Sequence, residues 1–232
     1  MKILISGISG KMGQILKKDV IEHEKTTYVG GFDLVKDFNE NIDFDVLIDF
    51  SHQSQIKDVV DFAVKNNKPL VTATTGLTNE DYQYIEKKSK EIPIFQSHNF
   101  SYGIQVLLKA LNAVLPLVND FDIEVIEKHH QYKVDAPSGT AKMIVEDIKK
   151  VRKNAHVVNH YEQKRNKEDI GVHALRAGTI VGEHEILLAS KDEMITIKHE
   201  ALSKQIFSQG AIRAALFIKN KETGLFNMND LV

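Results

Sequence analysis

The first hundred residues alternate short apolar runs with amphipathic stretches, a pattern that predicts strands joined by helices. The apolar runs lack polar–apolar alternation, which is typical of strands buried on both faces of a parallel sheet. We expect strands at Lys2–Ser6, Thr27–Phe32, Asp45–Phe50, Pro69–Thr72 and Ile92–Gln96, and helices at Gln14–His23, Gln53–Asn66 and Asn79–Lys90, the last capped by Asn79. This order predicts an α/β fold with a Rossmann-like doubly wound parallel sheet.

The pattern changes near Ser101, where a long apolar helix is expected at Tyr102–Leu117. A second helix is expected to begin at Ser138 and to reach Val151. Strands are expected at Asp122–Glu127, around His156–Glu162, and at His173–Arg176, Glu183–Ala189 and Met194–His199. The last two are joined by a short turn, so this half predicts a smaller α+β domain with a mixed or antiparallel sheet.

A final amphipathic helix is expected at Gln205–Lys219. The change of pattern near Ser101 therefore predicts two domains, with the boundary between residues 100 and 101.

Composition limits the class of protein without identifying the function. The chain has 232 residues, of which 42% are hydrophobic and 27% charged, as in ordinary globular proteins. Its net charge of −2 predicts neither nucleic acid nor a membrane as a partner. There is no cysteine, which excludes thiolate catalysis and thiolate metal sites, and we expect no metal. Without a signal-peptide pattern or a long apolar run, the expected location is cytoplasmic.

Three glycines follow the first strand at GxxGxxG spacing: Gly7, Gly10 and Gly13. Alone, this spacing indicates only a tight turn. The turn opens a helix, however, and Asp33 ends the next strand, which together favour a dinucleotide site. The loops after the later strands are expected to line the same crevice. The predicted cofactor-binding residues are Gly7, Ile8, Ser9, Gly10, Lys11, Met12, Asp33, Phe50, Ser51, Ala73, Thr74, Thr75, His98, Asn99, Phe100 and Ser101.

The choice between NADH and NADPH stays open. Asp33 is suited to bonding the ribose hydroxyls, which favours NADH. Leu34 stands where an arginine would favour the 2′-phosphate of NADPH, although Lys11 and Lys36 are cations near enough to serve. The predicted cofactor is therefore NADH, NADPH or both.

The segment Glu127–Ala141 concentrates groups that transfer protons beside a helix start. It holds His129, His130 and Lys133, and then Pro-Ser-Gly-Thr at residues 137–140. If the strand continues, His129 and Lys133 share a face and His130 points the other way; a strand end lets both histidines converge. The amides of residues 138–140 are expected to offer unpaired donors to an anion.

Across nearly its whole length the chain resembles the dihydrodipicolinate reductases, also described as 4-hydroxy-tetrahydrodipicolinate reductases. The resemblance rests on Gly7–Gly13, Thr74–Gly76, Asn99–Ser101, Arg176–His184, Gly224–Met228 and, above all, Glu127–Thr140, which contains His-His-x-x-Lys-x-Asp-Ala-Pro-Ser-Gly-Thr at residues 129–140. It implies an NAD(P)H-dependent reductase of lysine and diaminopimelate biosynthesis that acts on a cyclic dicarboxylate, and a homotetramer. It also implies a dinucleotide-binding domain at residues 1–100, completed by residues 205–232, and a substrate-binding and oligomerisation domain at residues 101–204.

The resemblance also implies roles for single residues. His129 is expected to be the catalytic acid/base and Lys133 the second proton donor. The residues expected to bind substrate are His130, Ser138, Gly139, Thr140 and Lys204. Two other hypotheses are a different Rossmann-type amino-acid or sugar dehydrogenase and a non-catalytic nucleotide-sensing protein. The Pro-Ser-Gly-Thr anion site after the two histidines argues against a different dehydrogenase. A non-catalytic protein would be expected to have lost the proton-transfer residues, yet His129, His130 and Lys133 are all present.

Overall fold

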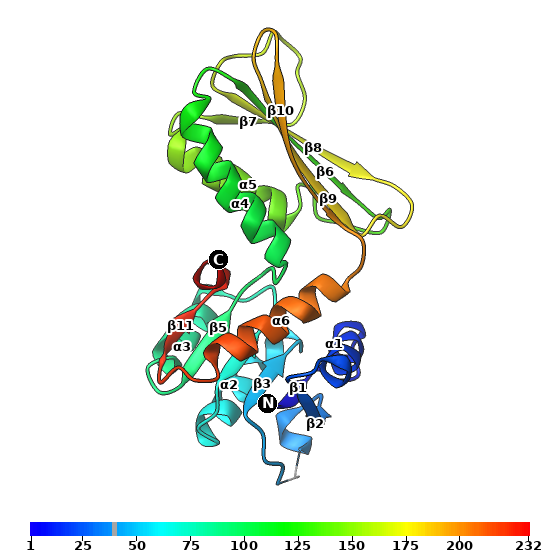
Figure 1. Ribbon diagram of the computed structural model, residues 1–232, viewed down its shortest axis with the longest axis vertical. Coiled ribbons are helices and arrows are strands. Elements are labelled where there is room, and N and C mark those ends of the chain that lie inside the picture. Colours follow the sequence, from blue (N-terminus) through cyan, green and yellow to red (C-terminus); the bar gives the residue numbers. More distant parts are fainter. Residues whose placement is uncertain (39–40) are drawn as a thin grey trace. The chain divides into compact units, whose positions relative to one another are not determined.

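The protein, a computed structural model that describes residues 1–38 and 41–232, divides into two compact units. Unit 1 comprises Met1–Tyr102 together with Lys204–Val232, and unit 2 comprises Gly103–Ser203. Figure 1 shows the chain leaving unit 1 through helix α4 and returning to it at helix α6. No helix in the part of the chain that the structure describes is both long and apolar enough to span a bilayer.

Unit 1 contains a six-stranded sheet in the order β11-β5-β4-β3-β1-β2, with every neighbouring pair parallel. Its strands are β1 (Lys2–Ser6), β2 (Thr27–Phe32), β3 (Val46–Asp49), β4 (Leu70–Thr72), β5 (Pro93–Gln96) and β11 (Gly224–Phe226). The five strands expected from the sequence are present, which confirms the Rossmann-like sheet. The short strand β11 was not expected; its three residues give too little pattern to predict a strand.

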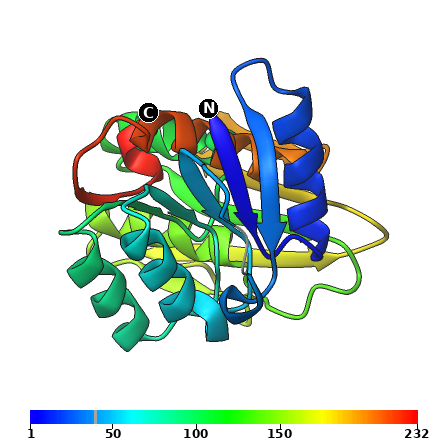
Figure 2. The same cartoon turned by 90° about the horizontal axis from the view of Figure 1, so that it is seen from below.

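Helices cover both faces of this sheet, as Figure 2 shows. Helices α1 (Lys11–Glu22) and α6 (Gln205–Ile218) pack on one face, and α2 (Ile56–Lys65) and α3 (Asn79–Lys88) on the other. Both cores are apolar on the strand side, which explains the continuous apolar runs in the sequence. Short 3-10 helices occur at Val35–Asp37, Gln53–Gln55 and Met228–Leu231.

Two helix starts differ from the expectation. Helix α1 begins at Lys11, inside the glycine pattern, rather than at Gln14. Helix α3 is capped by Thr78 and not by Asn79, because the Thr78 hydroxyl and the Asp81 carboxylate bond each other's backbone amides in a capping box.

Unit 2 contains a five-stranded mixed sheet in the order β10-β9-β6-β8-β7. Its strands are β6 (Asp122–His129), β7 (His156–Val158), β8 (Asp169–Arg176), β9 (Gly182–Ala189) and β10 (Met194–Ala201). Strands β6, β8 and β7 run parallel, whereas β9 is antiparallel to β6 and β10. Strand β8 begins four residues before its expected start, and β7 ends well before Glu162.

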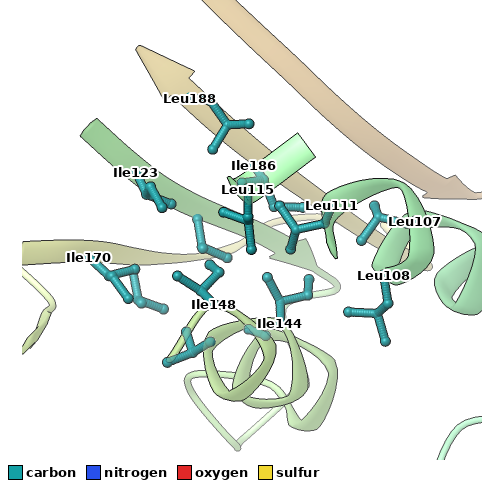
Figure 3. Close-up of a cluster of buried hydrophobic side chains, with 14 of the residues drawn as sticks. Leu107, Leu108, Leu111, Leu115, Ile123, Ile144, Ile148, Ile170, Ile186 and Leu188 are labelled. Carbon is teal, nitrogen blue, oxygen red and sulfur yellow. The ribbon is translucent and has the colours of Figure 1, made fainter. Parts of the chain in front are cut away.

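Helices α4 (Tyr102–Val114) and α5 (Gly139–Val151) bury one face of this sheet, with the 3-10 turn Leu115–Leu117 after α4. Leucines of α4 meet isoleucines of α5 and the strands in one cluster (Figure 3). Burial alternates strictly along β6, so Ile123, Val125, Glu127 and His129 point toward the helices. The strand therefore carries a glutamate and a histidine into the helix-covered side of the sheet, where Arg176 of β8 and His184 of β9 also lie beside the apolar cluster.

Candidate active site

The chain of unit 1 reverses its direction of winding between β1 and β3, the place where open α/β sheets bind ligands. Gly7 follows β1 with φ 78°, and its amide donates to the Phe32 carbonyl at 2.8 Å. A Cβ on Gly7 would lie 2.6 Å from the Phe50 carbonyl oxygen. Only glycine lets the loops after β1 and β3 approach this closely.

The N-terminus of α1 is left open for an anion. Gly10 caps it without a side-chain hydrogen bond, and the first turn holds no acidic residue. A Cβ on Gly13 would lie 2.1 Å from the Gly7 carbonyl oxygen, so the turn folds directly against the helix. Exposed Asp33 accepts a hydrogen bond from the Ser9 amide at 2.9 Å, which ties the end of β2 to the turn. These features suit a pyrophosphate beside a ribose.

A pocket of about 320 Å³ lies within unit 1 at the ends of β3, β4 and β5. It is lined by Met12, Phe50, Ser51, Ala73, Thr74, Thr75, His98, Phe100 and Phe207. All but Phe207, which α6 contributes, belong to the predicted cofactor set. The Ser51 hydroxyl is buried and has no hydrogen-bond partner among the described residues, so a polar ligand group fits there.

Buried Asp49 holds together the loops that line this pocket, a role that was not predicted from the sequence. Its carboxylate accepts from the Thr72 and Thr74 hydroxyls at 2.9 and 2.8 Å and from the Ser51 amide at 3.0 Å. The loops after β3 and β4 are thereby joined by one charged group. An acid at the end of a buried apolar strand was the available signal.

In unit 2, Glu127 is the centre of the proton-transfer segment. Its side chain is fully buried, and both oxygens accept from the Arg176 guanidinium, at 2.7 and 2.9 Å. One oxygen also accepts from the Ser138 amide at 3.0 Å, and the other is hydrogen-bonded to Nδ1 of His129. A carboxylate that accepts four hydrogen bonds, two of them from a guanidinium, offsets the cost of its burial.

This arrangement sets the charge states of the pair. Burial alone raises the pKa of Glu127, but the hydrogen bonds from Arg176, His129 and the Ser138 amide hold it below its ordinary value. Burial lowers the pKa of His129, and Glu127 opposes that shift only in part. The resting pair at neutral pH is therefore a carboxylate and a neutral imidazole.

The loop after β6 is held by the same arginine. Arg176 Nε donates to the Lys133 carbonyl at 3.2 Å, and its terminal nitrogen donates to the Asp135 carbonyl at 2.6 Å. The Lys133 ammonium bonds the Asp135 carboxylate at 2.7 Å, which lowers the pKa of Asp135. Arg176 thus anchors the loop that carries Lys133, and the carboxylate of Asp135 fixes the position of the Lys133 ammonium.

The two arrangements left open for the histidine pair are now resolved. Strand β6 ends at His129, and His130 lies just beyond it, half-buried, in front of a turn whose Lys133 amide donates to the His130 carbonyl at 3.1 Å. Its Nδ1 is buried and makes no hydrogen bond within residues 1–38 and 41–232. The strand end, rather than a continued strand, therefore determines where the second histidine points.

Ser138 is the N-cap of α5, as expected, and its hydroxyl accepts from the Ala141 amide. The expectation that its own amide is a free donor was wrong, because Glu127 occupies it. The Ser138 hydroxyl also bonds Nε2 of buried His184 at 3.1 Å. Burial, followed by the proximity of His129, lowers the pKa of His184 to about 4. Among the three residues at this helix start, Gly139 is the exposed one.

The remaining predicted residues divide between the units. Lys204 is exposed at the start of α6 and belongs to unit 1, whereas His129 belongs to unit 2. Glu127, Arg176 and His184 had no role assigned from the sequence, although each lies in a block that carried the resemblance. Among the described residues, no cluster of histidine, aspartate and glutamate side chains is arranged to hold a metal ion.

Comparison with known proteins agrees with this geometry. Residues 1–100 match the family model of the N-terminus of dihydrodipicolinate reductase, and residues 103–232 match that of its C-terminus. The chain is 42% identical to 4-hydroxy-tetrahydrodipicolinate reductase of Caldanaerobacter subterraneus over 100% of this chain and 98% of the relative. It is 40% identical to the enzyme of the same name from Clostridium novyi, with the same coverage.

A solved structure gives the same fold. Dipicolinate-bound dihydrodipicolinate reductase from Paenisporosarcina sp. TG-14 superposes with a TM-score of 0.83 at 22% identity, covering 100% of this chain and 99% of that one. At this identity the likeness establishes the architecture alone.

Proposed function

Because the chain belongs to the dihydrodipicolinate reductase family, we propose that it reduces 4-hydroxy-tetrahydrodipicolinate to tetrahydrodipicolinate in lysine and diaminopimelate biosynthesis. The substrate loses water to give the unsaturated dihydrodipicolinate. Two electrons and one proton then arrive as a hydride from NAD(P)H, which becomes NAD(P)⁺, and a second proton comes from the protein. The observation that carries the proposal is the His129–Glu127 pair, fixed next to the Lys133 loop in a chain of this family.

Cofactor binding is assigned to unit 1. The open start of α1 would hold the pyrophosphate, Asp33 the ribose hydroxyls, and the 320 Å³ pocket the nicotinamide. When bound, the dinucleotide supplies the hydride. One carboxylate oxygen of Asp33 accepts from the Ser9 amide, and the other can accept from a ribose hydroxyl, which favours NADH. Lys11 and Lys36 could still bind the 2′-phosphate of NADPH. We therefore propose dual use with NADH preferred.

Substrate binding and proton delivery are assigned to unit 2. Negative charge develops on the ring as hydride arrives, and a nearby acid stabilises it. His129 is neutral at rest because burial lowers its pKa; the negative charges of a bound dicarboxylate raise that pKa and so load the imidazole with a proton. Lys133 would hold one carboxylate and supply the proton when the imidazole does not. His130, Gly139 and Thr140 would contact the second carboxylate.

The assembly proposed is a homotetramer acting in the cytoplasm. The helix-free face of the unit 2 sheet carries the apolar side chains of Leu175 and Met194, which are 45% and 60% exposed. Apolar side chains on an open sheet face support its use as a subunit contact. Sedimentation of the purified protein tests this: a tetramer is expected, and a monomer at micromolar concentration would contradict it.

Steady-state assays with enzymatically generated substrate test the activity. We expect oxidation of NADH and NADPH that depends on the substrate, with a higher kcat/KM for NADH. Oxidation of neither cofactor would refute the reductase assignment. An inositol or an amino acid, supplied with NAD⁺ or NADP⁺, is the control for another dehydrogenase activity, and neither should support reduction of the cofactor.

A further inference from the structure

One buried carboxylate in unit 2 joins three separate segments of the chain. Glu127 lies on β6, and its partners are His129 on the same strand, Ser138 at the start of α5, and Arg176 at the end of β8. Its side chain is 0% exposed, so substrate does not reach it. Any effect of Glu127 on the reaction must therefore act through these partners.

The contact with His129 fixes which ring nitrogen carries the proton. A carboxylate only accepts hydrogen bonds, so His129 must donate from Nδ1 when its ring is neutral. Nε2 then holds the lone pair and becomes the nitrogen that gains and loses a proton. The opposite tautomer would place two acceptors, Nδ1 and the carboxylate oxygen, against each other, and Nε2 would already carry a proton and could not accept another.

Gly182 of β9 lies beside the Nε2 edge of His129. A Cβ on Gly182 would lie 3.1 Å from Nε2 and 3.3 Å from Cδ2 of His129, closer than side chains normally pack. The ring of His184 meets the His129 ring edge-on, with centroids 5.2 Å apart. The imidazole is thus enclosed by His184, by its own strand and by β9, and a side chain at position 182 would crowd Nε2.

Arg176 extends the same control to the second proton donor. Its guanidinium is shared between the Glu127 carboxylate and the carbonyl groups of Lys133 and Asp135. The planar fork of arginine allows these contacts at once, which a lysine could not provide. The position of the Lys133 loop is therefore tied to the group that holds His129.

We propose that Glu127 and Arg176 are positioning residues, which fix His129 as its Nδ1–H tautomer and hold the Lys133 loop beside it. This inference rests on the proposed function for its kinetic consequences but not for the tautomer itself. Loss of the carboxylate charge also removes the interaction that favours a protonated His129, so the affinity of the ring for its proton should fall.

The decisive measurement is the histidine tautomer in the intact protein. Proton–nitrogen correlation spectra of ¹⁵N-histidine-labelled protein, assigned with His129→Gln, should show Nδ1 protonated and Nε2 unprotonated at neutral pH. An Nε2–H signature for His129 in the wild type overturns the inference, whether or not any variant folds.

Variants separate the positioning role from a structural one. Glu127→Gln should lower kcat by about 10² to 10⁴-fold, the scale seen when a histidine loses its orienting carboxylate. The KM for NADH should be unchanged, and the pH limb of kcat/KM assigned to His129 should move to lower pH. Arg176→Lys should raise the KM for substrate more than it lowers kcat, because it loosens the loop and leaves the tautomer intact.

Glu124→Gln is the matched control. Glu124 lies on the same strand facing the other way and has similar partners, Arg165 at 3.1 Å and His173 at 2.7 Å. It should keep the wild-type pH profile and the His129 tautomer. A Glu127→Gln enzyme with wild-type turnover would refute the inference. Wild-type protein without reductase activity would instead refute the proposed function, and the tautomer spectrum would still decide the positioning role.

Discussion

The two units bring ligands and chain together by opposite means. The proposed cofactor site of unit 1 is made of backbone: a glycine turn, an open helix start and loops that meet because Gly7 and Gly13 have no side chains. The proposed active side of unit 2 is made of charges, with fully buried Glu127 paired to partly exposed Arg176. Substitutions that add a side chain to a glycine should therefore damage the site in unit 1, and substitutions that remove a charge should damage the site in unit 2.

The largest expected effect comes from removing the proton donor in unit 2. His129→Gln should lower kcat by about 10² to 10⁴-fold, as expected for the loss of an acid/base group. The Kd for NADH, measured by fluorescence titration, should stay at the wild-type value because unit 1 is untouched. His160→Gln is the control, since His160 is exposed and should behave as the wild type. If His129→Gln lowered turnover and cofactor affinity equally, the assignment of cofactor binding to unit 1 and proton transfer to unit 2 would be contradicted.

A methyl group tests the backbone site. In Gly13→Ala the new Cβ would lie 2.1 Å from the Gly7 carbonyl oxygen, so the turn must move. We expect the Kd for NADH to rise at least about tenfold and the free energy of unfolding to fall by about 1–3 kcal/mol.

Gly139→Ala is the matched substitution in unit 2, where nothing lies within 4 Å of the added Cβ. Its unfolding free energy should stay within about 1 kcal/mol of the wild type, with unchanged cofactor affinity. Similar damage from both substitutions would show that the two helix starts do not differ as described.

Acid should destabilise unit 2 first. The folded-state pKa of His184 is lowered from 6.5 to about 4, so between these pH values the unfolded chain binds a proton that the folded chain refuses. The contribution of neutral His184 to the free energy of unfolding is fully present above pH 6.5. It is lost as the pH drops toward 4, which lowers the free energy of unfolding by on the order of 3 kcal/mol. None of the described histidines of unit 1 is buried.

Amide hydrogen exchange at pH 7 and pH 5 measures this difference. Protection in β6 and β9 should decrease more than protection in β1 and β3, and His184→Gln should reduce the gap. Equal losses in both units would contradict the assignment of the acid response to His184.

The smallest expected effect concerns cofactor choice. Leu34→Arg places a cation beside Asp33, where it can meet a 2′-phosphate. We expect kcat/KM for NADPH to rise about tenfold, the value of one charged hydrogen bond, while that for NADH changes little. Lys36→Ala should act in the opposite direction on NADPH. An unchanged cofactor ratio in both variants would show that the 2′-position lies elsewhere.

The sequence predicted unit 1 better than unit 2 for a physical reason. Turn glycines, apolar strands and helix starts are local features, so Gly7, Asp33 and the pocket loops could be found from their spacing. The partners of His129 are not local: Arg176 is 49 positions from Glu127, and His184 is 46 from Ser138. Sequence alone does not show which strands become neighbours, and so the buried acid at Glu127 had no assigned use.

Errors in the elements have similar causes. Strand β11 was missed because three residues carry no period, and it forms only because β5 offers an unpaired edge. The free amide expected at Ser138 was wrong because a buried carboxylate from another segment took it. In each case a tertiary partner decided the local structure.

The discontinuity of unit 1 has a consequence for synthesis on the ribosome. Residues 204–232 supply α6 and β11, and α6 buries Ala211, Ile212, Ala214, Ala215 and Ile218 against the first sheet. Until about a hundred further residues have been translated and unit 2 has emerged, the nascent Rossmann sheet therefore has only α1 on the face that α6 later helps to cover. Unit 2 is contiguous and can fold while the chain is still growing. The order of folding is thus the reverse of the order of translation, with the first domain to be made the last to be completed.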